Sequence, residues 1–335
     1  MAKFRLMGPM ARYTGYAVGF RGLVRKLVTK SDIQFQLRAA KGHIPPETEE
    51  FFLELIHRNG DFDRLGVMVG FPPLIDDLPC RYISLYSMYE ADNLPEAWKG
   101  PVGRAEEVWV PSRFCYDVFR RYNPRTRIVP WGIDTEVFRK PKRKPKNEEF
   151  TFGSVGVQSP RKGTDVLLKA FDAAFGGRPG VMLIIKTRDT RQLPSFDNDQ
   201  VTVIDADWPE EKLVEFMQGL DCLVESSRGE GQGMPPLQAA ACGVPSLVTA
   251  WGGMLDYADG KGVYPIRIKG LSPAKNIGAN NANWAEPDPN HLAELMQWAV
   301  DTRPRVTGDY SRWSLQSMAN EFHTCVKQSW QAAIR

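Results

Sequence analysis

The sequence predicts an α/β protein with two domains, each a parallel sheet covered by helices on both faces. Two observations support this prediction. The chain has 335 residues, 42% of them hydrophobic and 25% charged, which suits about two globular domains of ~150 residues each. Short apolar runs rich in β-branched residues alternate with segments of helical periodicity, a pattern typical of parallel sheets.

The N-terminal half supplies the first set of elements. A strand is predicted at residues 4–7, and the glycines after it lead into a helix with apolar side chains at 20, 23, 24 and 27. A second helix is predicted at 49–57. Apolar runs at 65–70 and 82–86 predict two more strands, and a further strand feeds a helix near 110–114.

The second half begins after a basic segment, R-K-P-K-R-K-P-K at 139–146, which predicts an exposed, stiff linker. Beyond it we expect a strand at 150–155, a turn at 159–163 and a helix, followed by further strands. A helix at 210–219 precedes an apolar strand at 220–224. The tail from residue 311 is amphipathic and predicts a long helix.

Charge and composition narrow the functional classes. Residues 1–45 hold nine basic residues and one acidic residue, Asp32. This imbalance predicts either an anionic partner, nucleic acid or acidic lipid, or an ordinary solvated face. The five scattered cysteines form no C-x-x-C pair, so neither a disulfide framework nor a zinc site is expected. No long apolar run is present, which predicts a soluble, cytoplasmic protein with at most peripheral membrane contact.

The stretch from Val224 to Asp256 carries the main functional motif. It runs from a strand through a loop with glycines at 229, 231 and 233 into a helix with Pro235 and Pro236 in its first turn. Proline is tolerated there because the first N–H groups of a helix have no internal partner. Free N–H groups, glycine backbone and the positive end of the helix dipole together suit a phosphate. Glu230 inside this loop suits sugar hydroxyls, so a phosphorylated sugar is the expected ligand.

This stretch resembles the donor-binding signature of the retaining GT-B glycosyltransferases of group 1 (family 4). Their pattern is E-G-F-G-x-P-x-x-E, then A-x-A-x-G-x-P-V and a G-G loop. Three N-terminal segments also resemble that family, at 90–98, 110–114 and 129–134. The residues that match the signature are Glu230, Gly231, Gly233, Pro235, Ala239, Gly243, Pro245, Gly252 and Gly253.

The resemblance implies a GT-B fold, in which two Rossmann-like doubly wound domains face a cleft and a C-terminal helix crosses back. The expected boundaries are an acceptor-side domain at 1–138, a linker at 139–149 and a nucleotide-sugar domain at 150–310. The tail at 311–335 is expected to pack back on the first domain. A nucleotide sugar is the implied donor substrate, and no cofactor or obligate protein partner is expected.

The resemblance also assigns site residues. Lys162 is expected to reach the donor diphosphate, Glu230 to hold the sugar, and Glu90, after a strand, to orient or deprotonate an acceptor hydroxyl. A helix cap or an ion pair is the alternative role for Glu90. The predicted donor-binding residues are Gly15, Tyr16, Arg161, Lys162, Asp207, Gly231, Gln232, Gly233, Met234, Pro235 and Gln238.

For retaining members, a front-face mechanism is implied in which the departing phosphate oxygen takes the acceptor proton. No Asp-x-Asp motif is present, so no metal is expected. Two positions depart from the family. Val157 stands where many relatives have a basic residue, so Arg161, Lys186 or N-terminal arginines are expected to meet the phosphate charge. Gln238 replaces a glutamate that holds the ribose hydroxyls, which costs ~1 kcal/mol.

Two alternatives to transfer remain open at this point. One is a catalytically weak GT-B module that binds a nucleotide sugar or nucleic acid without transfer, suggested by Val157 and Gln238. The other is an epimerase or phosphorylase on the same fold. The acceptor also stays open among modified DNA bases, anionic lipid, acidic glycan precursors and protein side chains.

Overall fold

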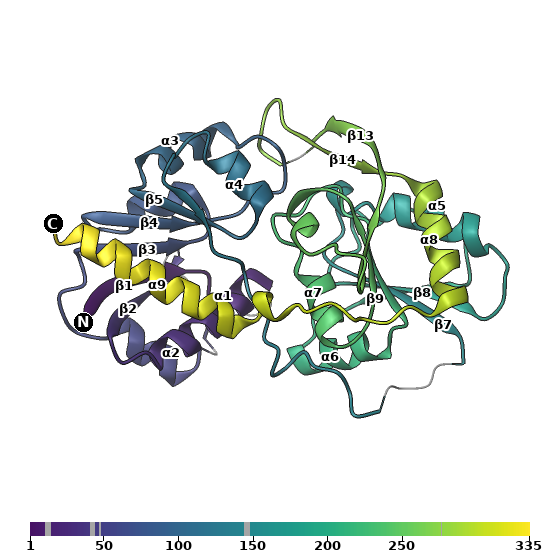
Figure 1. Ribbon diagram of the computed structural model, residues 1–335, viewed down its shortest axis with the longest axis horizontal. Coiled ribbons are helices and arrows are strands. Elements are labelled where there is room, and N and C mark those ends of the chain that lie inside the picture. The colour runs from purple at the N-terminus through teal and green to yellow at the C-terminus, as the bar shows by residue number, and fades with distance from the viewer. Residues whose placement is uncertain (11–14, 41–43, 47, 144–147, 276) are drawn as a thin grey trace.

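A computed structural model describes residues 1–10, 15–40, 44–46, 48–143, 148–275 and 277–335. Residues 11–14, which lie between the predicted glycines at 8 and 15, and linker residues 144–147 lie outside the described residues. Figure 1 shows two α/β domains side by side, with the C-terminal helix lying over the first. The predicted α/β class with two parallel sheets is confirmed.

The first domain contains a six-stranded parallel sheet. Its strands are β1 (Ala2–Gly8), β2 (Ile33–Ala39), β3 (Leu65–Val69), β4 (Tyr82–Tyr86), β5 (Glu107–Val110) and β6 (Thr126–Ile128). Their order in space is β2-β1-β3-β4-β5-β6, so the order in which successive strands are added to the sheet reverses between β1 and β3. The helical segments are α1 (Gly15–Val28), α2 (Glu50–Ile56), η2 (Pro72–Asp77), α3 (Glu96–Arg104) and α4 (Arg113–Phe119).

The second domain contains another six-stranded parallel sheet. Its strands are β7 (Phe150–Val155), β8 (Val181–Thr187), β9 (Val201–Asp205), β10 (Cys222–Glu225), β11 (Ser246–Thr249) and β12 (Val263–Ile266). Their order in space is β12-β11-β10-β7-β8-β9, so the strand order reverses between β7 and β10. The helical segments are η3 (Pro160–Lys162), α5 (Thr164–Phe175), α6 (Glu210–Gly219), α7 (Met234–Ala241), η4 (Gly252–Asp256) and α8 (Pro289–Thr302).

Helices cover both faces of each sheet because alternate strand side chains point to opposite sides. In β3, Val67 packs on the side of α1, whereas Met68 packs on the side of α3 and α4. In β10, Val224 packs against α5 and α8, and Leu223 faces α6. Each sheet is therefore doubly wound.

A hairpin that the sequence analysis did not predict joins the two domains. Its strands, β13 (Ile268–Pro273) and β14 (Asn283–Pro287), pair antiparallel and extend from the second domain. The Asn283 backbone N–H and side chain donate to Asp92 in the first domain, with N···O distances of 2.6 and 3.1 Å. The Tyr89 hydroxyl donates to the carbonyl of Ile277, at 2.6 Å. The hairpin therefore spans the domain boundary.

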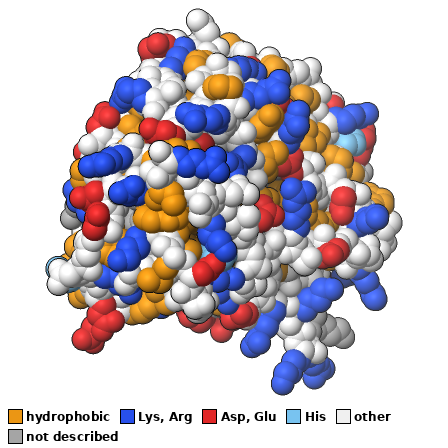
Figure 2. All heavy atoms as spheres, turned by 60° about the vertical axis from the view of Figure 1, so that its left-hand side comes forward, with side chains coloured by type: hydrophobic (Ala, Val, Ile, Leu, Met, Phe, Trp, Pro, Cys, Tyr) orange, Lys and Arg blue, Asp and Glu red, His pale blue; other side chains and the backbone are white. Residues whose placement is uncertain are grey.

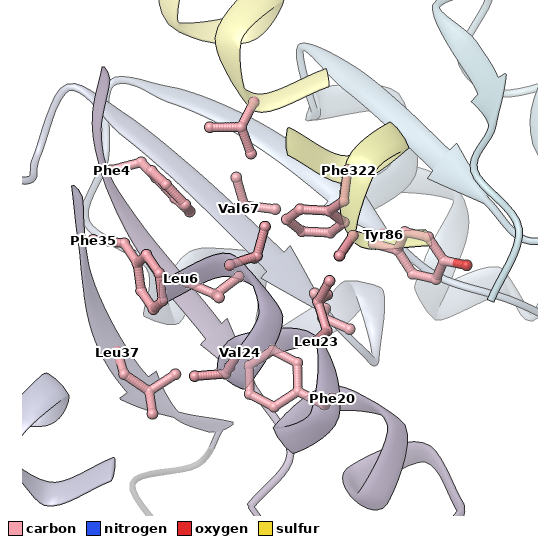
Figure 3. Packing of buried hydrophobic residues seen from close by; sticks show 14 of the residues in the cluster. Phe4, Leu6, Phe20, Leu23, Val24, Phe35, Leu37, Val67, Tyr86 and Phe322 are labelled. Carbon is pink, nitrogen blue, oxygen red and sulfur yellow. The ribbon is translucent and has the colours of Figure 1, made fainter. Parts of the chain in front are cut away.

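The tail returns to the first domain through η5 (Ser311–Trp313) and α9 (Leu315–Ala333). Figure 3 shows Phe322 of α9 between Val67 and Tyr86. Phe322 is fully buried, and its ring centroid lies 5.0 Å from that of Trp109. The predicted helix that crosses back is therefore confirmed, with its apolar stripe inside the first core.

The surface carries mixed charge. Figure 2 shows Lys and Arg side chains spread over the visible face with Asp and Glu among them. On α1, Arg25 pairs with Glu49, and the Nζ of Lys26 lies 2.9 Å from the Glu136 carboxylate. These pairs neutralise much of the basic N-terminal helix. None of the helices in the described ranges has the length and apolar character needed to cross a bilayer.

Candidate active site

A cleft of about 1150 Å³ lies between the domains. Its walls include residues that follow the carboxyl ends of β3 and β4 in the first domain, such as Gly70 and Ser87. The opposite wall follows β7, β8 and β10. Ligands of open α/β sheets bind beyond the carboxyl ends of strands where the strand order reverses, and the boundary between β7 and β10 is such a place.

Four charged side chains meet at that boundary. Glu230 accepts from Arg161 Nη1 at 2.6 Å and from Lys162 Nζ at 2.8 Å. Lys162 Nζ also lies 3.2 Å from both oxygens of Glu225, whose side chain is 2% exposed. Two of the predicted site residues, Lys162 and Glu230, are therefore in direct contact, and Arg161 joins them.

Glycines allow this close packing. Gly156, directly after β7, has φ +155°, and an added Cβ there would lie 2.7 Å from Cε of Lys162. At Gly229 an added Cβ would lie 2.0 Å from the carbonyl oxygen of Glu90 in the other domain. A side chain at either position would collide with these neighbours, so the local geometry favours glycine at both positions.

The charge states in this cluster follow from burial and partners. Burial alone would raise the pKa of Glu230, but Arg161 and Lys162 outweigh it and lower the pKa to about 2. For Glu225, burial dominates and raises the pKa to about 7, although Lys162 opposes the shift. Burial also disfavours charged Lys162, but Glu225 and Glu230 keep its pKa above the ordinary value. Glu225 is therefore the member of the cluster that changes charge near neutral pH.

Glu90 lies on the first-domain side of the same cleft and is half-buried. Burial raises the pKa of its carboxyl; Glu230 adds to this shift, whereas Arg161 and Lys162 oppose it. Glu90 lines the same cleft as Arg161, Lys162 and Glu230, and its backbone carbonyl lies against Gly229, the residue before Glu230. A carboxyl with a raised pKa in such a position suits proton exchange with a hydroxyl.

The start of α7 forms the floor beside this cluster. Gly233 precedes the helix with φ +78°, and Pro235 occupies its first turn. Of the predicted donor-binding residues of this segment, Gln232, Gly233, Met234, Pro235 and Gln238 line the cleft. Gly231 does not line it, because its carbonyl accepts from the Ser112 hydroxyl at 2.6 Å and its backbone packs against Met88.

The predicted residues of the first domain also reach the cleft. Gly15 begins α1, and an added Cβ there would be 3.7 Å from the sulfur of Met234 across the cleft. Tyr16 follows, with its ring centroid 4.9 Å from that of Trp131. Burial raises the pKa of the Tyr16 hydroxyl well above its usual range, so this group stays neutral.

A second polar region lies beyond β8 and β9. Lys186 Nζ donates to the carbonyl of Ala206 at 2.8 Å and lies 5.1 Å from the Trp208 ring centroid. Burial lowers the pKa of Lys186. Asp207 and Arg188 line the cleft beside them, as does Arg21 of α1. Val157, 39% exposed, also lines the cleft. Because valine carries no charge, the cations near the predicted donor site come from other positions.

Two features of the site were not predicted from the sequence. One is Glu225, which ends β10 one residue beyond the predicted strand; the carboxyl-end rule would have found it. The other is an aromatic wall, defined here as Phe71, Tyr89 and Trp98. Phe71 is 62% exposed, and its ring centroid lies 5.5 Å from that of Trp98, which in turn lies 5.0 Å from Tyr89. In the described residues, no group of three or more His, Cys, Asp or Glu is placed to hold a metal ion.

Comparisons with known proteins agree with this architecture. Residues 134–263 match the family model of the glycosyl transferases group 1. The D-inositol 3-phosphate glycosyltransferase of Acidothermus cellulolyticus is 24% identical over 240 residues, which cover 62% of this chain and 53% of that protein. The chain thus spans about half the length of this curated relative.

Solved structures cover nearly the whole chain. A sucrose-phosphate synthase from Thermosynechococcus elongatus superposes with a TM-score of 0.73 at 16% identity, covering 99% of this chain and 100% of that one. An α,α-trehalose-phosphate synthase from Burkholderia xenovorans gives a TM-score of 0.67 at 9% identity, with 98% and 100% covered. The chain therefore has the GT-B fold, and its residues 134–263 resemble the group 1 glycosyl transferases.

Proposed function

We propose that this protein transfers a sugar from a nucleoside diphosphate sugar to an acceptor hydroxyl, with retention of the anomeric configuration. The observation that carries the proposal is the contact of Arg161 and Lys162 with Glu230 in the interdomain cleft, beside the start of α7. Cations and free helix N–H groups suit a diphosphate, and a carboxylate three residues before the helix cap suits sugar hydroxyls.

Neutralisation of the diphosphate falls to protein groups in this proposal. Arg161 and Lys162 donate hydrogen bonds to Glu230 and Glu225 in the free protein. When the diphosphate binds, both cations donate some of these hydrogen bonds to the phosphate oxygens instead, and the start of α7 adds N–H donors. These groups take the role that a divalent ion has in metal-dependent transferases. Gln238, 8% exposed and lining the cleft, binds the ribose through its amide.

Transfer proceeds on one face of the sugar. The bond from the anomeric carbon to the diphosphate oxygen breaks, and its electron pair leaves with the diphosphate. The acceptor oxygen bonds to the same face of the oxocarbenium-like centre, and its proton passes to the departing phosphate oxygen. Glu230 steadies the ring hydroxyls. Glu90, which lines the cleft from the first domain, orients the acceptor hydroxyl.

The acceptor lies against the first domain, next to Glu90 and the aromatic wall. Among the described cleft residues, the first domain contributes one cation, Arg21. The ion pairs of Arg25 and Lys26 leave α1 with reduced charge for a nucleic acid or lipid headgroup. The geometry therefore favours recognition of the acceptor through a ring or apolar face. A salt-dependent mobility shift on duplex DNA and sedimentation with anionic vesicles test the two charged partners.

Turnover of a nucleotide-sugar panel tests the function. Labelled UDP- and GDP-sugars are incubated with cellular fractions, and release of nucleoside diphosphate and transfer of label are followed. Lys162→Met should reduce transfer at least about 100-fold, because the diphosphate loses a buried cation. Arg191→Met, at an exposed pair with Asp189 whose two members do not line the cleft, is the control. Transfer by Lys162→Met at the parent rate would contradict the proposal.

A second candidate function is nucleotide-sugar binding without transfer. It is favoured by the carboxylates that already occupy both cations, and by the glutamine at position 238. Tight binding with no turnover on any acceptor fraction would establish this function instead.

A further inference from the structure

The tip of the β13–β14 hairpin reaches from the second domain into the acceptor side of the cleft. Ile277 and Gly278 lie in the segment that joins the two strands, and both line the cleft. The hydroxyl of Tyr89, in the first domain, donates to the carbonyl of Ile277 at 2.6 Å. The Ile277 side chain packs against the core of the first domain. The tip is therefore held on the first domain, although its strands extend from the second.

Further contacts fix the hairpin next to this tip. The backbone N–H of Asp92 donates to the carbonyl of Asn283 at 3.1 Å, and the Asp92 carboxylate accepts from the backbone and side chain of Asn283. Ala282, 3% exposed, is buried in the core of the first domain. Because these contacts lie a few residues from the tip, Ile277 keeps a defined place in the cleft.

The hairpin tip meets the aromatic wall of the first domain. Phe71, Tyr89 and Trp98 all line the cleft, as Ile277 does. Trp98 contacts both other rings, with centroid distances of 5.0 Å to Tyr89 and 5.5 Å to Phe71. Phe71 is 62% exposed. A large exposed ring in a cleft marks a surface that a ligand can cover.

The chemistry of this surface is apolar. The side chains of Phe71 and Ile277 have no hydrogen-bonding atoms, and the Tyr89 hydroxyl already donates to a backbone carbonyl. Burial, together with the Glu90 carboxylate, raises the pKa of that hydroxyl well above its usual range, so it stays neutral. A saccharide would find few partners for its hydroxyls on these side chains. An aromatic ligand gains from ring contacts beyond the area that it buries.

This surface also adjoins the proposed reaction centre. Tyr89 precedes Glu90, whose carbonyl lies against Gly229 in the loop that carries Glu230. We propose that the aromatic wall and Ile277 form an acceptor subsite for a phenol-type acceptor, whose hydroxyl is attached to an aromatic ring. The aryl oxygen bonds to the anomeric carbon as the bond to the diphosphate breaks, and the hydroxyl proton passes to the departing phosphate oxygen. The inference rests on the proposed transfer and adds the class of acceptor.

Calorimetric titration with matched alcohols tests this class. The probes are β-naphthol, its saturated counterpart β-decalol and methyl glucoside, each titrated into the protein saturated with UDP and, in parallel, with GDP. The saturated alcohol buries a similar apolar area, so area alone gives no preference for the aromatic one. We expect β-naphthol to bind at least about fivefold more tightly than either other alcohol. No binding of β-naphthol, or binding no tighter than that of the other two, would overturn the inference.

Substitutions of Phe71 separate ring contacts from general apolar contact. Phe71→Ala should weaken β-naphthol binding about tenfold. Phe71→Leu, which keeps apolar bulk without a flat ring, should weaken it about fivefold, and Phe71→Tyr should bind within about twofold of the parent. Phe196→Ala is the matched control, because Phe196 is 37% exposed but does not line the cleft. Parent-like binding by Phe71→Ala would overturn the inference.

The hairpin tip has its own test. Tyr89→Phe keeps the ring of the aromatic wall and removes the hydrogen bond to Ile277. We expect faster amide hydrogen exchange at residues 277–283 and about threefold weaker β-naphthol binding, because the tip is no longer fixed beside the wall. Exchange and affinity that both match the parent would overturn the place of Ile277 in the acceptor subsite.

The outcomes for inference and function are distinct. Sugar transfer to an acceptor fraction by a protein that shows no preference for β-naphthol overturns the acceptor class and leaves the transferase function standing. UDP and GDP should bind every Phe71 variant within about twofold of the parent affinity, because the proposed donor groups lie in the second domain. Failure of the parent protein to bind UDP, GDP or their sugars overturns the proposed function, and the acceptor subsite with it.

Discussion

Glu225 is the residue of the site whose carboxyl can gain or lose a proton near neutral pH. It is buried at the end of β10, with both carboxylate oxygens 3.2 Å from Lys162 Nζ. Lys162 has Glu230 as its second carboxylate partner, and Tyr257 lies close enough for the charges of both carboxylates to raise its pKa. A diphosphate entering beside these carboxylates adds negative charge, so it favours the protonated form of Glu225.

Donor binding should therefore take up a proton. The pKa of Glu225 is raised to about 7, so the residue is protonated below that pH and charged above it. Affinity for a nucleotide sugar should fall by up to about tenfold per pH unit above this value. A nucleotide sugar is the right probe because its phosphates do not titrate in this window. Calorimetry in buffers of different ionisation enthalpy measures the uptake.

The Glu225→Gln variant gives the control for this pH dependence. It should bind with little change between pH 6 and pH 9, values that bracket the raised pKa at about 7. A parent-like pH profile in Glu225→Gln would assign the titration to another group, such as Glu90, whose pKa is also raised by burial.

Residue patterns predicted part of this site. The glycine loop with Glu230, and Lys162 on its own turn, were both expected, and they meet at 2.8 Å. The position of Glu225 at a strand end marks it as a candidate, but its pairing was not expected, because the cation that allows this carboxylate to be buried comes from elsewhere in the chain. Partners brought together only by tertiary structure, here 63 residues apart, leave no local pattern.

At the scale of elements, the β13–β14 hairpin went unpredicted because most of β13 is exposed and shows no apolar alternation. Arg228 anchors the hairpin to the donor domain. Its guanidinium donates to both oxygens of Glu286 in β14 and both oxygens of Asp165 in α5, at 2.8 Å each. The long helices α1, α5 and α9, by contrast, were predicted, because each buries an apolar face with helical period. Helix α8 and strands β11 and β12 were not predicted.

Removing the Arg228 anchor should destabilise the second domain. Arg228→Met leaves Glu286 and Asp165 without their cation. Their side chains are 34% and 39% exposed, so water compensates in part. We expect the free energy of unfolding of this domain to fall by about 2 kcal/mol, measured by denaturant titration. Arg191→Met, which removes an exposed pair with Asp189, should cause no measurable change; equal losses in both variants would contradict a structural role for Arg228.

At the scale of the whole molecule, the two domains meet through close contacts. The Ser112 hydroxyl donates to the carbonyl of Gly231 at 2.6 Å, and the Phe114 and Trp251 ring centroids lie 4.5 Å apart. The two-domain plan was predicted from periodicity and the resemblance, but these contacts were not. They depend on the relative placement of two separately folded units.

Gly229 tests whether this closed arrangement is needed for transfer. A Cβ at this position would lie 2.0 Å from the carbonyl oxygen of Glu90, so Gly229→Ala should hold the domains apart. The residues proposed to grip the diphosphate, Arg161 and Lys162, belong to the second domain. Diphosphate affinity should therefore stay within about threefold of the parent value, whereas turnover should fall about 100-fold, because the acceptor is no longer brought to the sugar. Small-angle X-ray scattering should show a larger radius of gyration. Gly219→Ala, where an added Cβ meets nothing within 4 Å, should match the parent in all three measurements, and parent-like turnover in Gly229→Ala would show that transfer does not require the closed cleft.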